Sequence, residues 1–151
     1  MGALKDQLQT DLTAAMKAQD ELVRSTLRMA LTAIGNEEVA GKAARTLSGE
    51  EELAVVVREA KKRREAAEAF RSGGAGDRAE RELAEEGVLA AYLPAQLGDD
   101  ELQALVATAV AQTGATGPRQ LGDVMKVVRP QTAGTVEGGR LAAAVKAALP
   151  G

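Results

Sequence analysis

SGEEELAVVVREAKKRREAAEAFRSGGAG, residues 48–76, contains the longest helix that the sequence predicts. Ser48 and Glu51 have the spacing of a capping box, in which the serine covers a first-turn amide and the glutamate reaches back to another. The helix should continue to about Arg71 and end at Gly73-Gly74-Ala75-Gly76, because successive glycines are unfavourable in a helix. The residues expected to face inward are Leu53, Val56, Val57 and Ala60.

The second half of this helix carries the densest charge in the chain, with six cations and three glutamates between residues 58 and 71. One interpretation is a solvated face, because Glu59–Arg63, Lys61–Glu65 and Arg64–Glu68 stand four residues apart and can pair. The other is a ridge that contacts phosphates. The spacing favours the solvated face. Arg64 continues the apolar line, so we expect it to lie at a buried edge with a partner.

Helices are also predicted on both sides of this segment. Leucines and other apolar residues recur every three or four positions over residues 3–19, and Asp20 is a natural N-cap for a second helix that should fray before Thr46. The short link between these two predicts an antiparallel helical hairpin. A further helix is expected over residues 77–92.

Pro94 is the expected boundary between a first domain, residues 1–94, and a second, residues 95–151. The second should hold three short helices. One begins near residue 99 and ends at Gly114, one begins at Pro118 and is stopped by Pro130, and the last runs from about Glu137 to residue 149. No segment alternates like a β-strand. The sequence therefore predicts an all-α protein, with an N-terminal helical hairpin and long helices followed by a small three-helix domain.

Cysteine and histidine are both absent from the 151 residues. Their absence removes thiolate nucleophiles, disulfides, Cys/His zinc sites and the usual general base near neutral pH. The remaining carboxylates and lysines show no cluster that suggests catalysis. We therefore expect no catalytic residue, no cofactor and no metal.

Charge and hydropathy limit which partners and which compartment we expect for the protein. The composition is 45% hydrophobic and 27% charged, with a formal net charge of −3, which disfavours indiscriminate binding to nucleic acid. Beyond residue 102, however, five cations face only two acids, so a local basic surface is expected there. With no membrane span and no leader in view, we expect a soluble, cytoplasmic protein with no membrane partner.

GDVMKVVRPQTAGTVEGG, residues 122–139, concentrates four glycines in a chain that is otherwise helical in pattern. Neither the P-loop nor the dinucleotide-loop spacing is present. Two interpretations stay open: an ordinary connection between helices, or an exposed loop around Gly134, Glu137 and Gly138. That loop would lead into a helix N-terminus whose free amides hold an anion.

Several short motifs resemble those of the YqeY family. Residues 92–97, YLPAQL, resemble its YLPxQL segment; residues 122–125, GDVM, resemble a GKVM-like element; and residues 134–138, GTVEG, stand where GRADG is common. Residues 4–8, 25–29 and 63–65 match as well. One departure is that Thr135 replaces the arginine of GRADG, which removes a bidentate phosphate contact from the loop.

The resemblance implies a second half similar to the tail domain of GatB, a subunit of the tRNA-dependent amidotransferase. It implies a non-catalytic, tRNA-binding protein, with a glutamine-dependent carbon–nitrogen ligase label by association only. The alternatives are a helical protein–protein adaptor, with a partner in the translation apparatus, and a component of that amidotransferase activity. The expected RNA contacts are Arg63, Arg64, Arg119, Lys126, Arg129 and Arg140.

Overall fold

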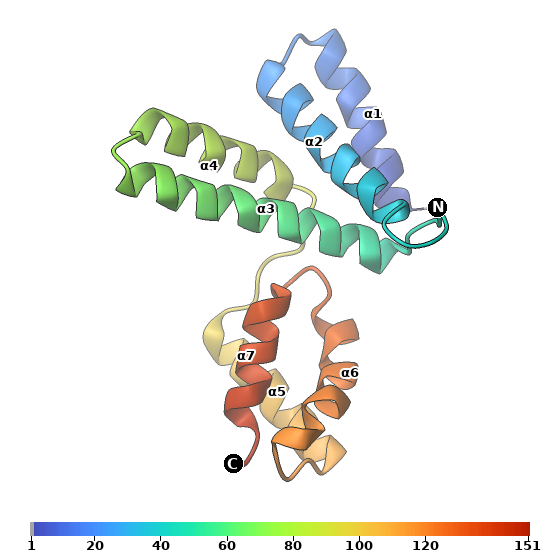
Figure 1. The fold of residues 1–151 in the computed structure, drawn as a ribbon, viewed down its shortest axis with the longest axis vertical. Coiled ribbons are helices and arrows are strands. Elements are labelled where there is room, and N and C mark those ends of the chain that lie inside the picture. The colour runs from blue at the N-terminus through green and yellow to red at the C-terminus, as the bar shows by residue number, and fades with distance from the viewer. Residues whose placement is uncertain (1) are drawn as a thin grey trace. The chain divides into compact units, whose positions relative to one another are not determined.

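The computed structural model describes residues 2–151, and within that range every regular element is helical (Figure 1). Residues 2–151 form seven α-helices and one 3₁₀ turn without a β-strand, so the all-α prediction is confirmed. The chain divides into two compact units, Met1–Leu93 and Pro94–Gly151.

The first unit contains four helices: α1 (Ala3–Lys17), α2 (Glu21–Glu38), α3 (Gly49–Ser72) and α4 (Gly76–Ala90). The starts of α2 and α3 follow the predicted caps. The Asp20 carboxylate accepts a hydrogen bond from the Val23 amide at 3.2 Å, and Ser48 and Glu51 form both bonds of the capping box. The buried apolar residues shared by these helices are Leu8, Leu27, Ala30, Ile34, Leu47, Val55, Val56, Ala60 and Leu89.

The buried face of α3 differs from the predicted one. After Ala60 it continues through Arg63 and Ala67, whereas Arg64 is exposed, so the expectation that Arg64 lies at the buried edge is wrong. Both residues satisfy helical spacing, and the choice between them depends on where α2 and α4 pack against α3. The position of those neighbours is not encoded in the periodicity of α3 itself.

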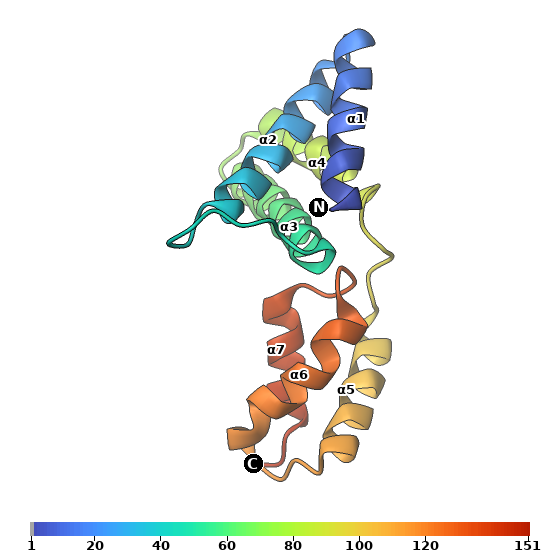
Figure 2. The ribbon, with the colours of Figure 1, turned by 90° about the vertical axis from the view of Figure 1, so that its right-hand side faces the viewer.

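The second unit is a three-helix bundle of α5 (Asp99–Thr113), α6 (Leu121–Thr132) and α7 (Gly138–Ala148), with the 3₁₀ turn η1 (Pro118–Gln120) leading into α6 (Figure 2). Gly114 ends α5 in the left-handed conformation, with φ of 67°, as its position predicts. The core of this bundle consists of Leu102, Val106, Ala109, Ala115, Val124, Met125, Val128, Val136, Leu141, Val145 and Leu149.

Pro130 does not stop α6, contrary to the sequence prediction, because the helix continues to Thr132. A proline removes only its own amide donor and crowds the preceding turn. Here the last turn retains support from Thr132, which is buried and whose hydroxyl donates to the Val128 carbonyl at 2.8 Å. The chain turns away only after this residue, and Gly134 adopts φ of 76° in the loop that follows.

Two findings bear on the setting of the protein. Within residues 2–151, no helix combines the length and the apolar character needed to cross a lipid bilayer. The same residues contain no group of three or more acidic side chains placed to hold a metal ion.

Candidate nucleic-acid interface

Three of the predicted cations belong to η1 and α6 of the second unit, and we call this set the α6 stripe: Arg119, Lys126 and Arg129. All three are exposed, and none has a side-chain hydrogen bond or ion pair with another described residue. Lys126 and Arg129 stand three residues apart on α6, so their side chains project from one face of that helix, whereas Arg119 lies just ahead of it in η1. Asp123 is the acidic residue within this stretch.

The opposite side of α6 fixes the orientation of the stripe. Val124 and Val128 are fully buried and Met125 is 7% exposed, all in the core shared with α5 and α7. Rotating the helix to hide Lys126 would expose this apolar surface to water, which is unfavourable by roughly 25 cal/mol per Å². The stripe therefore faces solvent because of the packing beneath it.

The proposed anion site at the start of α7 is already filled by the chain itself. Glu137 is the N-cap, and its carboxylate accepts hydrogen bonds from the amides of Gly139 at 2.8 Å and Arg140 at 3.0 Å. These are the amides that an external phosphate would need. Gly138 is exposed beside these two amides, and Gly134 is buried.

Gly134 and Thr135 instead hold the segment that enters this unit. The Gln96 side-chain amide donates to the Gly134 carbonyl at 2.9 Å, and the Leu97 amide donates to the Thr135 carbonyl at 2.9 Å. The Thr135 hydroxyl donates to the Thr132 carbonyl at 2.9 Å. The glycine-rich loop is thus joined to the YLPAQL segment, and residues far apart in sequence lie side by side.

Arg140 belongs to the same set of contacts. Its guanidinium donates to the Leu97 carbonyl at 2.8 Å and to the Asp99 carboxylate at 2.7 Å. A phosphate contact would compete with both bonds. Arg140 therefore positions the start of α5, and the RNA contact that the sequence suggests for it stays a prediction.

Arg63, another predicted RNA contact, is buried in the first unit. Its side chain is only 9% exposed and pairs with Glu59 at 3.0 Å, while its Nε lies 3.9 Å from the Glu85 carboxylate. Its second terminal nitrogen also contacts the Met29 sulfur at 3.1 Å. The predicted pairing of Glu59 with Arg63 is confirmed, but in a buried setting rather than on a solvated face.

Arg64 is exposed but engaged. It pairs with Glu86 of α4 at 2.8 Å, not with Glu68 as the spacing predicts. Other cations of this run also form ion pairs: Arg58 pairs with Glu37 at 3.3 Å, and Lys62 pairs with Glu59 at 3.1 Å. Much of the positive charge of α3 is therefore balanced by nearby acids, which favours the solvated interpretation over a phosphate-contacting ridge.

Tyr92, the first residue of YLPAQL, is tied to the first unit. Its hydroxyl donates to the Asp11 carboxylate at 2.5 Å, across 81 positions of sequence. Burial, followed by this bond to a negative group, raises the pKa of the Tyr92 phenol well above its ordinary value. The motif thus has an anchor in each unit, Tyr92 in the first and Gln96 with Leu97 in the second. The sequence did not predict these contacts, although the YLPAQL motif that contains the three residues was recognised.

No curated protein matches this chain in a similarity search. The family model described as Yqey-like protein matches residues 5–149, nearly the whole chain. With both units inside the matched region, this chain belongs to the YqeY family.

Proposed function

We propose that this chain is a cytoplasmic, non-catalytic RNA-binding protein that contacts the phosphate backbone through the α6 stripe. One observation carries the proposal. Of the six cations predicted to bind RNA, Arg63, Arg64 and Arg140 are engaged by acids or carbonyls, whereas Arg119, Lys126 and Arg129 are exposed without such partners among residues 2–151. Exposed cations without acidic partners are available to bind phosphates.

The aromatic content favours recognition of shape and phosphate over base sequence. The whole chain has one Phe and one Tyr, and neither lies in the second unit. Phe70 carries the Arg78 guanidinium over its ring at 5.7 Å, and Tyr92 is bonded to Asp11. Base stacking of the kind used by single-strand binders has no platform beside the stripe. We therefore expect folded RNA, whose backbone geometry can be read without base contacts.

The choice of tRNA rests on the similarity of the second half to the GatB tail. It is part of the proposal, as is the idea that the second unit acts as a tail-like RNA-binding domain. The chemistry of the α6 stripe is consistent with any folded RNA, so competing RNAs belong in the test. Among them, tRNA should compete better than an unstructured RNA of equal length.

The test is filter binding of tRNA across a salt series. Three phosphate contacts predict a slope of log affinity against log salt of roughly −2.7 if each contact contributes about −0.9. Lys126→Glu with Arg129→Glu should reduce the slope to about −1 and weaken binding more than tenfold at low salt. The matched control is Lys42→Glu with Arg71→Glu, which changes the net charge equally at exposed positions of the first unit.

Two results would overturn the proposal. One is tRNA affinity that does not depend on salt. The other is an equal loss of affinity in the stripe variant and in the control, since that would assign the effect to net charge rather than to this surface. Circular dichroism of both variants checks that the helices remain intact.

A further inference from the structure

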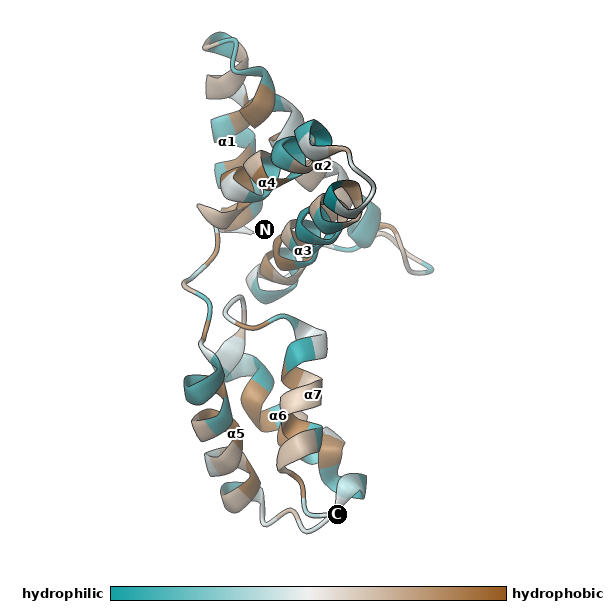
Figure 3. Ribbon diagram, turned by 90° about the vertical axis from the view of Figure 1, so that its left-hand side faces the viewer, coloured by the Kyte–Doolittle hydropathy of each residue, from teal (hydrophilic) through white to brown (hydrophobic). Residues whose placement is uncertain are grey.

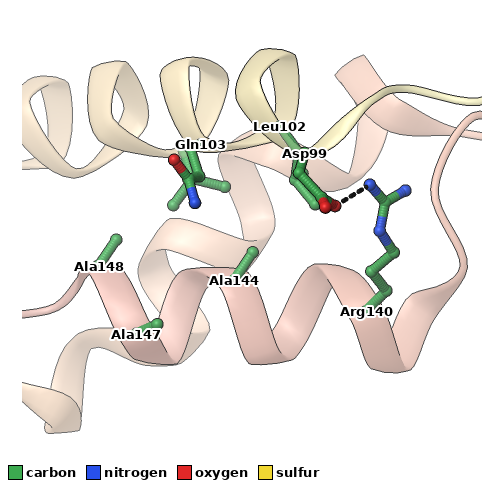
Figure 4. Close-up of a pocket in the computed structure, with 8 residues that line it drawn as sticks. Asp99, Leu102, Gln103, Arg140, Ala144, Ala147 and Ala148 are labelled. Carbon is green, nitrogen blue, oxygen red and sulfur yellow. Dashed lines mark hydrogen bonds and ion pairs between the residues drawn. The ribbon is translucent and has the colours of Figure 1, made fainter.

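The second unit has an open groove on the side formed by α5 and α7 (Figure 4). Its volume is about 410 Å³, and its walls are Leu102, Gln103 and Val106 from α5 and Ala144, Ala147 and Ala148 from α7. Both helices begin at the same end of the groove, where Arg140 pairs with Asp99 at 2.7 Å. The alanines leave the groove unfilled by side chains.

The surface around this groove is poor in charge. Residues 102–118 contain no charged side chain, and Lys146 is the one charge in residues 141–151, although 27% of the whole chain is charged. Exposed positions of α5 beyond its first turn carry alanine, glutamine or threonine: Gln103, Ala104, Ala107, Thr108, Ala111 and Gln112. Depletion of charge distinguishes the cores of protein–protein interfaces from other surface.

One end of the groove is acidic. Asp99, Asp100 and Glu101 form the first turn of α5, all exposed, and the Asp99 side chain is 86% accessible despite its bond to Arg140 (Figure 3 shows this turn as hydrophilic and the rest of α5 as largely apolar). Three carboxylates against one guanidinium leave this end negative. That potential repels a nucleic-acid backbone and attracts a basic group.

We propose that the α5/α7 groove binds an amphipathic helix of a partner protein, with its small or aliphatic face in the groove and a Lys or Arg at the acidic end. Two neighbouring helices with small residues between them allow a third helix to approach closely and pack into their groove. The acidic end of the groove favours a partner helix that carries positive charge there. This surface is distinct from the α6 stripe, so the inference stands independently of RNA binding.

The test uses two synthetic helical peptides with the same Ala/Leu face. One carries Lys at its polar positions and the other carries Glu. Titration of the isotope-labelled full chain, followed by NMR, should show the Lys peptide shifting the amides of Gln103, Ala144 and Ala147 with submillimolar affinity. The Glu peptide should bind at least tenfold more weakly.

Two variants make the result specific. Ala147→Gln fills the groove with a neutral, helix-compatible side chain and should weaken the Lys peptide at least fivefold. The matched control is Ala69→Gln, the same change at an exposed position of α3, which should leave the affinity unchanged. Asp100→Lys with Glu101→Lys should remove the preference between the two peptides without unfolding the bundle.

Several outcomes would overturn the inference. They are an absence of groove shifts at millimolar peptide, equal binding of both peptides, shifts confined to the α6 stripe, and groove shifts that depend on protein concentration alone, which would indicate a second copy of this chain as occupant. tRNA binding by Ala147→Gln should equal that of the parent chain, so failure here is distinguishable from failure of the RNA proposal.

Discussion

Arg63 donates a hydrogen bond to Glu59 at 3.0 Å, and both side chains are less than a tenth exposed. With Glu85, itself buried on α4, they form an ionic cluster inside the first unit. Taking charges out of water is unfavourable, so a buried cluster of this kind depends on every member being present. It fixes α4 against α3 at the cost of making Arg63 unavailable to a ligand.

Arg63→Ala should therefore lower the free energy of unfolding by up to about 3 kcal/mol, because it removes the one buried cation between Glu59 and Glu85 and leaves each of them a single more exposed partner, Lys62 or Arg81. Urea unfolding followed by the fluorescence of Tyr92, the sole tyrosine, reports on this unit. The control is Arg64→Ala, which removes the exposed pair with Glu86 and should cost less than about 1 kcal/mol. Similar losses for the two variants would contradict the buried cluster.

Tyr92 makes the stability of the first unit sensitive to alkaline pH. Its pKa is raised in the folded chain from an ordinary 10.0, so the folded state holds the phenolic proton more tightly than the unfolded state. The stabilisation is complete below pH 10 and is lost as pH rises above it. Tyrosinate absorbance should thus appear near pH 10 in urea and only at distinctly higher pH in buffer.

Tyr92→Phe provides the control for this pH dependence. It should abolish the extra alkaline sensitivity and lower the free energy of unfolding by about 1–2 kcal/mol at neutral pH, because Asp11 loses the Tyr92 hydroxyl and keeps only the exposed bond from the Gln7 amide. If native and urea-unfolded chains titrate together, the Tyr92–Asp11 bond does not persist in solution.

Glu137→Ala should weaken the start of α7. The carboxylate serves two amides there, and loss of an N-cap costs about 1 kcal/mol. Hydrogen exchange at Gly139 and Arg140 should accelerate by roughly fivefold, which is that energy expressed as a rate. Asp100→Ala, in the first turn of α5 where no side-chain cap is formed, is the comparison and should leave those two amides unchanged.

Arg140→Ala separates a positioning role from an RNA contact. Loss of the bonds to Leu97 and Asp99 should lower the stability of the second unit by about 1–2 kcal/mol. The salt slope of tRNA binding should not change, in contrast to Arg129→Ala, which should reduce its magnitude by about 0.9. If Arg140→Ala changed the salt slope as much as Arg129→Ala does, Arg140 would be an RNA contact after all.

Local chemistry by itself determined the elements of this protein. The Asp20 cap, the Ser48–Glu51 box and the Gly114 terminator each depend on residues within one helical turn, so the sequence predicts them directly. Pro130 is the exception, because buried Thr132 stabilises the turn beyond it.

The tertiary structure alone decided which cations are free. Arg63, Arg64 and Arg140 meet acids 22 to 41 positions away in sequence, Glu85, Glu86 and Asp99, and helix packing brings those acids into reach. Periodicity fixes the face of a helix on which a residue lies, but not the side chains opposite that face. For the same reason the α5/α7 groove was not predicted, since its walls come from helices separated by the whole of α6.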